Sequence, residues 1–355
     1  MADITKDNHQ KILVITINHS NAGLFAYVNF AINQLIYAEK HNLLPVVYFG
    51  PRSGNGDNAY YDARYGANMW DYYFEPVAGL TYSDIEERLA DTRNLLTSED
   101  LVTLTEQDLW QIHNQEPDSV YPYPHGIYLD TYKDDPDWYA KQRRKAHEII
   151  SKYIRVKPHI IEKVDTFARE HFAGNKVIGV HMRGTDKGTA RLTPELMKIV
   201  KPSEYFSYID EYTKRHGECK IFVATDQKQF LQQMRSRYGD RVLSRDTVRV
   251  SGLRNAFQLA GDGYRKGEEV LIDCLLLSRT DYLLKCTSAV GEFALYLNKD
   301  LPSVDLNHSI GALTGIQSYL LDLRQRAWQH YHHMDALRRR TNSNWLTTIF
   351  RYVFR

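Results

Sequence analysis

The chain has 355 residues, 43% of them hydrophobic, so it can bury a sizeable core, and its length favours two domains over one. A formal net charge of +1 argues against a general nucleic-acid binder, because such proteins carry a strong basic excess. The three cysteines suggest neither a disulfide framework nor a zinc site, and the polar start MADITKDNHQ suggests neither a signal peptide nor a membrane span, so we expect a cytosolic protein.

The first part of the chain begins with a βαβ pattern. Hydrophobic periodicity predicts a strand over 11–17, an amphipathic helix over 25–41 and a second strand over 44–49. Residues 50–140 are rich in Gly, Asn and aromatics and show no clean period. We interpret them as long loops lining a cleft, with packed structural loops as an equal alternative. Two helices are then expected, from Asp137 to Tyr153 and from Pro158 to His171.

A second α/β series follows. Its strands are predicted at 176–182, 220–225, 241–244 and 281–285, and its helices at 203–216, 227–238, 267–279 and 288–298. Two such series predict two doubly wound, Rossmann-like domains that face each other. The helix stop HFAGN marks the boundary. We therefore expect an N-terminal domain over 1–173, a C-terminal domain over 174–312 and a helical, basic tail over 313–355.

Polar side chains follow the first strand of the second series, in VIGVHMRGTDKGT at 177–189. Ligands of doubly wound domains bind outside the carboxyl ends of the strands, where His181, Arg183, Asp186 and Lys187 are expected. Arg183 offers a fixed cation with five donors, which suits phosphate oxygens. Neither the dinucleotide fingerprint nor the P-loop motif is present. The alternative is a salt bridge between Arg183 and Asp186, with His181 packed in the core.

Three stretches together resemble a family. VIGVHMRGTDK resembles the H-x-R-R-T-D-K motif of the α1,6-fucosyltransferases, a group that includes the core N-glycan enzyme and the rhizobial chitooligosaccharide enzyme. KIFVATDQKQFL is similar to the group's strand, ATDD and helix segment, and GYRKGEEVLIDCLLLSRTDYLLKCTSAVGEFALYL follows a third segment in order and spacing. In the first half only the loop NAG, before an amphipathic helix, resembles the family's glycine-rich opening.

The resemblance implies a GT-B-like fold with GDP-fucose in the second domain and a glycan acceptor in the cleft. It implies that His181 and Asp273 recognise guanine or its ribose and that Arg183 holds the pyrophosphate. It also implies donor contacts from Asp186, Asp226, Thr287 and Ser288 and, more loosely, a sugar-side role for Tyr205. Thr287 and Ser288 would act from a helix N-terminus, which offers N–H groups to an anion. A structural alternative pairs Asp273 with Arg279 or Lys266.

Two positions depart from the family motif. Gly184 stands where the family has a second arginine, so one phosphate cation is missing and the donor identity stays open. The glutamate expected as base falls on Arg191, and Glu195 in a longer loop is the substitute candidate. The implied chemistry is inverting transfer, in which Arg183 and Lys187 stabilise the departing diphosphate. It needs no metal and no cofactor beyond the donor. We interpret the D-x-D of DDPDW at 134–138 as a helix start, and His330, His332 and His333 as a solvated helix face.

Two alternatives to the fucosyltransferase interpretation stay open. One is a same-fold glycosyltransferase that uses another nucleotide sugar, and the other is a non-catalytic protein that binds a nucleotide sugar or glycan. The acceptor and its linkage are not readable from the residues.

The C-terminal tail suggests a further partner. From Arg324 onward there are seven arginines and one acid, a surplus of six positive charges, so the preceding residues carry −5 to give +1 overall. In NWLTTIFRYVFR the apolar residues gather on one helical face. Residues 338–355 therefore suggest peripheral contact with an anionic inner membrane surface and a lipid-linked acceptor. Docking of the same face on the protein's own body is an equal alternative.

Overall fold

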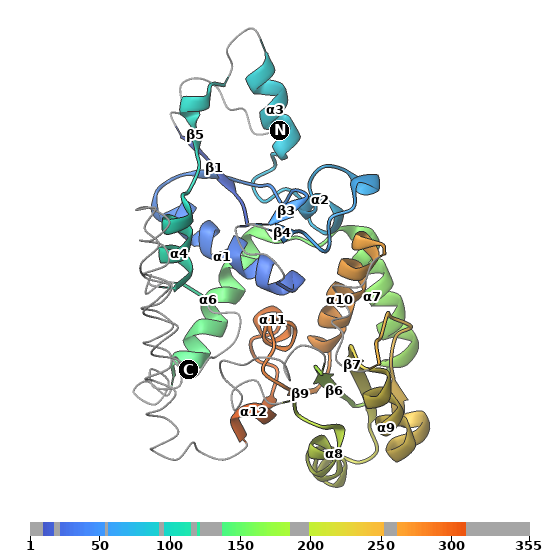
Figure 1. Cartoon of the computed structure of the whole chain (residues 1–355). Helices are drawn as coiled ribbons and strands as arrows, with labels where there is room; N and C mark the ends of the chain where they lie inside the picture. Colours follow the sequence, from blue (N-terminus) through green and yellow to red (C-terminus); the bar gives the residue numbers. More distant parts are fainter. Residues whose placement is uncertain are drawn as a thin grey trace, which may run out of the picture.

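The computed structural model describes residues 10–17, 22–53, 56–91, 96–114, 119–120, 137–184, 199–251 and 261–309. These residues form a mixed α/β structure with two parallel sheets and a short antiparallel ribbon (Figure 1). The tail over 313–355, including the predicted membrane contact at 338–355, lies outside the described residues. None of the helices within the described ranges is long and apolar enough to span a membrane.

The first sheet has three parallel strands in the order β2-β1-β5. These are β1 at Ile12–Ile15, β2 at Leu44–Val47 and β5 at Leu101–Val102. Helix α1 at Leu24–Lys40 connects β1 to β2, which confirms the predicted βαβ unit. Strand β1 is buried along its whole length, as expected for the middle strand of a parallel sheet.

The interpretation of 50–140 as long loops was wrong in part. The region contains helices α2 at Trp70–Tyr73, α3 at Tyr82–Ala90 and α4 at Glu106–Asn114, 3-10 turns at Ala63–Tyr65 and Ser98–Asp100, strand β5, and the ribbon of β3 at Arg52–Ser53 with β4 at Gly56–Asp57. Helix α3 starts with a capping box in which Thr81 Oγ1 accepts a hydrogen bond from Asp84 N at 3.1 Å and Asp84 Oδ2 accepts one from Thr81 N at 2.7 Å. This T-x-x-D start signal was present in the sequence.

The second sheet has five parallel strands in the order β10-β9-β6-β7-β8. The strands are β6 at Val177–Met182, β7 at Lys220–Thr225, β8 at Val242–Leu243, β9 at Tyr282–Lys285 and β10 at Ser303–Asp305. The helices are α8 at Pro202–His216, α9 at Lys228–Tyr238, α10 at Gly263–Leu277, α11 at Ala289–Leu297 and the short α12 at Leu306–Ser309, with a 3-10 turn at Gly239–Arg241. The chain moves outward from β6 through β7 to β8 and then returns to β9. The strand order therefore reverses between β6 and β9, which is where doubly wound folds bind ligands.

Helices cover both faces of this sheet. Alternate residues of β6, such as Ile178 and Val180, pack in one apolar cluster with residues of α8 and α9. Val177 on the opposite face belongs to a second cluster with residues of α10 and α11. Strand side chains alternate between faces, so His181 is expected on the α11 side with Val177.

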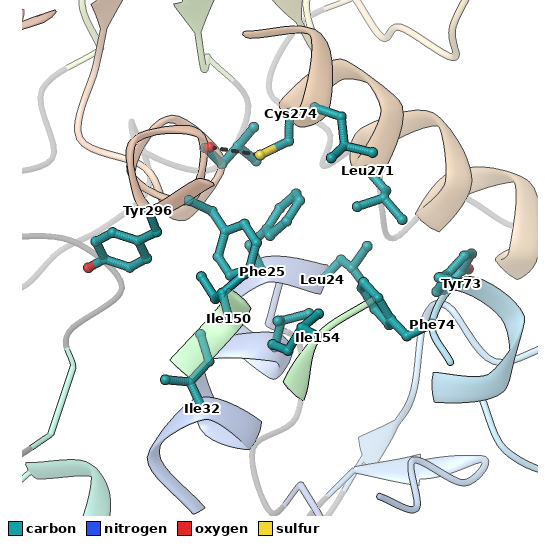
Figure 2. Close-up of a cluster of buried hydrophobic side chains, with 14 of the residues drawn as sticks. Leu24, Phe25, Ile32, Tyr73, Phe74, Ile150, Ile154, Leu271, Cys274 and Tyr296 are labelled. Atoms are coloured by element: carbon teal, nitrogen blue, oxygen red, sulfur yellow. Dashed lines mark hydrogen bonds between the residues drawn. The ribbon is translucent and has the colours of Figure 1, made fainter. Parts of the chain in front are cut away.

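A continuous apolar core joins the first half of the chain to the second. Helix α6 at Trp138–Tyr153 contacts α11, and helix α7 at Pro158–His171 contacts α10. In Figure 2, Phe25 of α1 and Ile150 of α6 lie beside Tyr296 of α11, and Leu24 faces Leu271 of α10. Helix α7 ends at His171, and Gly174 follows with a φ of 75°, which confirms the predicted helix stop. The division into facing domains at this point stays a prediction.

Candidate active site

A cavity lies at the carboxyl ends of β6 and β7, beside the point where the strand order reverses. Its lining residues are His181 and Met182 of β6 with Arg183 directly after it, Ala224 and Thr225 of β7 with Asp226 directly after it, Lys266, Glu269, Val270 and Asp273 of α10, and also Tyr60, Thr247, Val248 and Val290. Four of the residues that the sequence analysis predicted for the site therefore line the same cavity: His181, Arg183, Asp226 and Asp273.

His181 is fixed by its surroundings at the end of β6. The residue is buried, and its backbone carbonyl accepts hydrogen bonds from the Tyr205 hydroxyl at 3.0 Å and from Cys286 N at 3.3 Å. A Cβ at Gly291 of α11 would lie 3.2 Å from His181 Nδ1, so the imidazole packs closely against the start of that helix. Together these contacts hold the ring at the wall of the cavity.

Tyr205 does not reach the cavity. Its side chain is fully buried beneath β6, where burial raises the pKa of the hydroxyl well above its usual range. This position corrects the expectation that Tyr205 lies on the sugar side of the donor. In the structure its hydroxyl supports the backbone of His181.

Gly184 lies where a side chain would require its neighbours to shift. Its backbone N–H donates to Asp226 Oδ1 at 3.1 Å, which joins the segment after β6 to the segment after β7. A Cβ at this position would lie 2.7 Å from Gln227 Cγ and 2.9 Å from the ring of Phe230. The close approach to the start of α9 therefore favours glycine at the position of the second motif arginine.

The loop 244–250 forms one wall of the cavity. It was not among the segments predicted from the sequence to belong to the site. It is tied to α10 because Val248 N donates to Glu269 Oε2 at 2.8 Å, and Arg245 Nη1 donates to Glu269 O at 3.0 Å. It is tied to the end of β7 because Val250 N donates to Asp226 O at 2.9 Å. These seven residues show no periodic pattern in the sequence. Their place in the cavity wall could therefore be recognised only from the structure.

Asp273 is paired with Arg245 across this wall. Arg245 Nη1 donates to Asp273 Oδ1 at 3.1 Å. Burial raises the pKa of the Asp273 carboxyl, and the positive charges of Arg245 and Arg249 oppose that rise. The alternative pairing with Arg279 was wrong, because Arg279 instead donates to Asp165 at 2.6 Å. Asp273 is thus a largely buried carboxylate at the cavity wall.

One face of α10 carries three of the charged lining residues. Lys266, Glu269, Val270 and Asp273 are spaced at i, i+3, i+4 and i+7, which places them on the same side of the helix. Burial lowers the pKa of Lys266, and the nearby Asp262 carboxylate opposes that decrease. Burial therefore makes the charged form of Lys266 less favourable than it is in water, and a bound anion would offset that cost.

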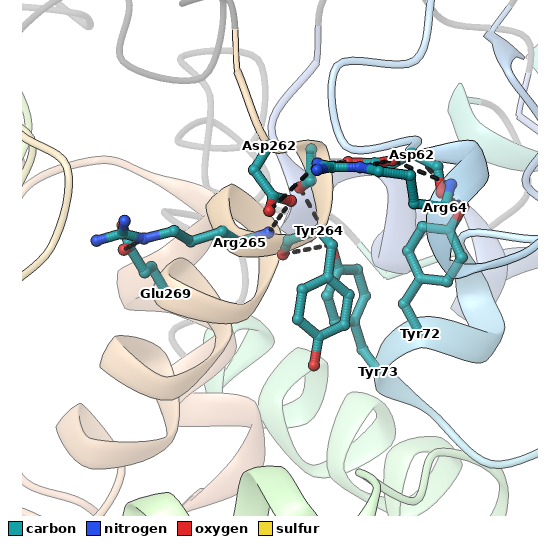
Figure 3. Close-up of polar contacts among 9 residues, drawn as sticks. Asp62, Arg64, Tyr72, Tyr73, Asp262, Tyr264, Arg265 and Glu269 are labelled. Atoms are coloured by element: carbon teal, nitrogen blue, oxygen red, sulfur yellow. Dashed lines mark hydrogen bonds and ion pairs between the residues drawn. The ribbon is translucent and has the colours of Figure 1, made fainter.

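Two glycines of α10 let the first half of the chain approach this helix. A Cβ at Gly263 would lie 2.6 Å from Tyr61 O, and one at Gly267 would lie 2.1 Å from the Tyr73 hydroxyl. Figure 3 shows the resulting contact, in which Asp62, Arg64, Tyr72 and Tyr73 meet the start of α10. This approach brings Tyr60 to the cavity. The G-x-x-x-G spacing of the two glycines was a sequence signal that could have predicted it.

Thr287 and Ser288 lie just before α11 but are not among the residues that line the cavity. Both are buried, and Thr287 N donates to Asn307 Oδ1 at 2.7 Å. Ser288 precedes the first helical residue, and Val290 in the first turn of α11 lines the cavity. The N-terminus of α11 thus reaches the cavity, while phosphate contacts by the two hydroxyls stay a prediction.

A buried ionic cluster lies behind this turn. Lys285 at the end of β9 is fully buried and contacts Asp305 at 2.5 Å and Glu292 of α11 at 3.1 Å. Burial alone would lower the pKa of Lys285, but the neighbouring carboxylates raise it well above its usual value. Tyr139 of α6 donates a hydrogen bond to Glu292 as well. The cluster links β9, β10, α11 and α6 directly beside residues 286–288.

The remaining nominated residues lie outside the described ranges. They are Asp186, Lys187 and Glu195, together with Asp134, Asp135 and the three tail histidines. Helix α6 begins at Trp138, directly after Asp137. Within the described residues, no three His, Cys, Asp or Glu side chains gather as a metal site would require.

Residues 62–295 match the family model for the N- and catalytic domains of alpha-(1,6)-fucosyltransferase. The chain belongs to this family. Membership confirms the resemblance inferred from the three motifs and makes the chain a glycosyltransferase of the fucosyltransferase class. The matched range contains every described residue that lines the cavity except Tyr60.

Solved fucosyltransferase structures are similar to this chain at low identity. The fucosyltransferase NodZ from Bradyrhizobium is 17% identical, with 84% of this chain and 96% of that chain covered and a TM-score of 0.48. NodZ α-1,6-fucosyltransferase co-crystallised with GDP is 18% identical, with 83% and 94% covered and a TM-score of 0.49. POFUT1 in complex with GDP-fucose is 11% identical, with 86% and 99% covered and a TM-score of 0.46.

Proposed function

We propose that this fucosyltransferase-family protein transfers fucose from GDP-fucose to a glycan hydroxyl with inversion at the anomeric carbon. The observation that carries the proposal is the grouping of His181, Arg183, Asp226 and Asp273 around one cavity at the carboxyl ends of β6 and β7. This is the location at which doubly wound sheets bind nucleotides. A GT-B-like arrangement would have the donor here and the acceptor on the side of the first half of the chain.

Asp273 and His181 are the groups proposed to recognise the base. A carboxylate can accept hydrogen bonds from two adjacent N–H donors, which guanine presents at N1 and N2. Uracil presents one N–H and adenine one amino group, so neither offers this pair. Asp273 has the required acceptor set, and Arg245 and Arg249 favour its ionised form. The buried imidazole of His181 supplies a second wall beside the start of α11.

Arg183 is proposed to hold the diphosphate. It is partly buried and lines the same cavity as Lys266 of α10, which supplies a second cation. Backbone N–H groups at the start of α11, with Thr287 and Ser288, would contribute a further positive field. Cations fixed in a partly desolvated site stabilise charge that develops on a leaving group more strongly than they would in water.

The proposed reaction breaks the bond between the sugar anomeric carbon and the β-phosphate oxygen of GDP. The acceptor hydroxyl oxygen forms the new bond from the opposite face, and its proton passes to a carboxylate. The electron pair of the broken bond leaves with GDP, where Arg183 and, from the segment outside the described residues, Lys187 stabilise it. Glu195, in that same segment, is the proposed proton acceptor. The scheme routes no step through a metal or a cofactor.

One observation favours a second candidate function. Gly184 stands where the family motif has a second arginine, and a side chain there would require Gln227 and Phe230 to shift, so the diphosphate site differs from the family pattern. A donor other than GDP-fucose, or binding of a nucleotide sugar without transfer, would fit this difference. Both alternatives keep the cavity as the ligand site.

A panel of nucleotide sugars tests the proposal. Thermal shift should increase most with GDP-fucose, because a ligand that binds the native state raises its stability. Calorimetric titration and a donor-hydrolysis assay with GDP-fucose should then show binding and turnover, both reduced in Arg183→Ala. A larger shift with another donor would support the altered sugar. Tight binding without turnover against every acceptor would support the non-catalytic alternative.

The proposed acceptor is lipid-linked, on the basis of the tail sequence. Residues 338–355 combine Arg338, Arg339 and Arg340 with a periodic apolar pattern, and each basic residue near an anionic leaflet contributes about 1 kcal/mol. Truncation after Thr341 should abolish co-sedimentation with anionic vesicles while leaving the melting temperature unchanged. Undiminished sedimentation, or unfolding of the shortened chain, would refute the membrane contact.

A further inference from the structure

Arg245 reaches from the loop after β8 to the carboxylate proposed to recognise the base. Its Nη1 donates to Asp273 Oδ1 at 3.1 Å and to the backbone carbonyl of Glu269 at 3.0 Å. Both ionic side chains are largely withdrawn from solvent, with exposed fractions of 17% for Arg245 and 13% for Asp273. A single guanidinium nitrogen therefore ties the carboxylate to the backbone of its own helix.

Arg245 is itself held from several sides. Arg249 Nη2 donates to the carbonyl of Arg245 at 2.8 Å. Glu269 accepts from Val248 N at 2.8 Å and from Arg265 Nε at 2.7 Å, which fixes the loop against α10. An arginine with this support presents its guanidinium in a defined direction, and little rotamer entropy remains to be lost.

The pairing leaves Asp273 able to accept further hydrogen bonds. A carboxylate has about four acceptor positions, and the contact with Arg245 uses one of them on Oδ1. The carboxylate lines the cavity, so a ligand can approach it from that side. A buried carboxylate without a cation beside it would tend to protonate and would then lose part of this acceptor capacity.

We propose that Arg245 is a positioning residue for nucleobase recognition, which orients Asp273 and keeps it ionised while the carboxylate accepts two adjacent N–H donors of the base. This inference rests on the proposed function, since it assumes that Asp273 contacts a guanine-type base. It assigns base specificity to a loop residue outside the three motifs that identify the family.

The charged groups around Asp273 determine how the ionisation of its carboxyl group, and hence its capacity to accept hydrogen bonds, changes with pH. Arg245 and Arg249 face it from the loop, and Glu269 faces it from its own helix. Other ionisable groups lining the same cavity are Tyr60, His181, Arg183, Asp226 and Lys266. Removing the Arg245 charge leaves burial and Glu269 less opposed, so the pKa of Asp273 rises further. His181 is present in every variant, so a difference between variants reports on Arg245.

Calorimetric titration of GDP and UDP across a pH series tests this role. Arg245→Gln should weaken GDP about tenfold or more, equivalent to about 1.4 kcal/mol, and should change UDP much less. The loss of GDP affinity on acidification should begin about one pH unit higher than in the wild type. Arg245→Lys retains the charge and should restore most of the wild-type pH profile. Arg279→Gln removes a comparable but exposed ion pair, with Asp165, and is the matched control.

Repeating the substitution in the Asp273→Asn variant keeps the test decisive if Arg245→Gln alone reduces stability. Asn at position 273 is neutral and needs no counter-ion, so in Asp273→Asn the further change Arg245→Gln should leave the GDP-to-UDP affinity ratio unchanged. A folded Arg245→Gln with wild-type affinity and pH profile would overturn the inference. Tighter GDP binding in that variant would overturn it too, since Arg245 would then compete with the base. Failure of the folded wild type to bind GDP would instead overturn the proposed function, and this inference with it.

Discussion

The Tyr73 hydroxyl donates a 3.0 Å hydrogen bond to the carbonyl of Tyr264 at the start of α10 and lies where a side chain at Gly267 would otherwise be. Tyr73 belongs to the first half of the chain, whereas α10 carries Lys266, Glu269 and Asp273 on the cavity side. The contact therefore sets the position of the helix that supplies three charged residues of the lining. Glycine at 267 is required by this close approach, although glycine weakens a helix.

Gly267→Ala should destabilise the protein, although alanine is the better helix former by up to about 1 kcal/mol. The added Cβ would lie 2.1 Å from the buried Tyr73 hydroxyl, and overpacking of this kind typically costs about 1–3 kcal/mol. Urea denaturation measures the change, with Lys214→Ala on the exposed side of α8 as a control for helix propensity. Helix propensity and packing predict opposite signs for the change in the free energy of unfolding. A stabilised Gly267→Ala would therefore contradict the close contact between Tyr73 and Gly267.

Arg183→Ala should reduce kcat/KM with GDP-fucose by an amount equivalent to about 3 kcal/mol or more. The partly buried arginine lines the cavity and is proposed to meet the charge that develops on the departing diphosphate. Steady-state kinetics measure the loss, and calorimetric titration of GDP separates ground-state binding from transition-state stabilisation. Turnover near the wild-type rate would remove Arg183 from the proposed mechanism.

Asp273→Asn should weaken GDP about tenfold to a hundredfold and should weaken UDP or ADP far less. The amide replaces one acceptor oxygen by a donor, which would oppose the guanine N–H groups. It also leaves Arg245 without its buried carboxylate partner, so the melting temperature should be recorded for the same protein. Equal losses for all three nucleotides would indicate that Asp273 has a structural role only.

Much of the second sheet could be predicted because its strands are short, continuous apolar runs. The predicted strand over 220–225 coincides with β7, and β6 and β9 differ from their predictions by one residue each. His181, Arg183 and Asp226 were predicted for the same reason, since polar residues at the ends of such strands point to the ligand-binding edge, and they line one cavity while their roles stay predictions. Sequence periodicity was sufficient to predict these strands because their local hydrophobic pattern agrees with their burial in the sheet.

Other parts of the site depend on contacts between distant segments. Arg245 and Val248 lie in a loop without periodicity and become part of the cavity through hydrogen bonds to Glu269. Tyr60 reaches the cavity because glycines of α10 admit the first half of the chain. Tyr205 was misplaced because its match to the family rested on order along the chain, which does not report which side of β6 it packs on. Order and spacing alone could not provide these relationships.

Lys285→Met should destabilise the protein by about 3–5 kcal/mol, because it leaves two buried carboxylates without their shared cation. Lys285 has no exposed surface and contacts both Glu292 and Asp305. Adding Glu292→Gln should recover part of the loss by removing one of the two carboxylate charges, of which Arg143, 3.6 Å from Glu292, offsets only a part. Thermal denaturation of the single and double variants measures the coupling. Strictly additive losses would show that Lys285 and Glu292 do not stabilise each other.

Gly184→Arg tests whether this chain can accept the arginine that the family motif has at this position. From charge alone the substitution should strengthen binding of a diphosphate, since it would add a second cation beside Arg183. The structure predicts the opposite result. A Cβ there would lie 2.7 Å from Gln227 Cγ and 2.9 Å from the Phe230 ring, and the Gly184 N–H that donates to Asp226 would be displaced with the backbone.

We therefore expect Gly184→Arg to lower the melting temperature and to weaken GDP, with overpacking alone costing about 1–3 kcal/mol. Gly184→Ala is the matched control, because it adds the clashing Cβ without the charge and should show most of the loss in stability. Differential scanning calorimetry and GDP titration of the two variants separate sterics from charge. A stable Gly184→Arg that binds GDP more tightly than the wild type would show that α9 yields at this point. The missing arginine would then be a difference of charge, with no steric cause.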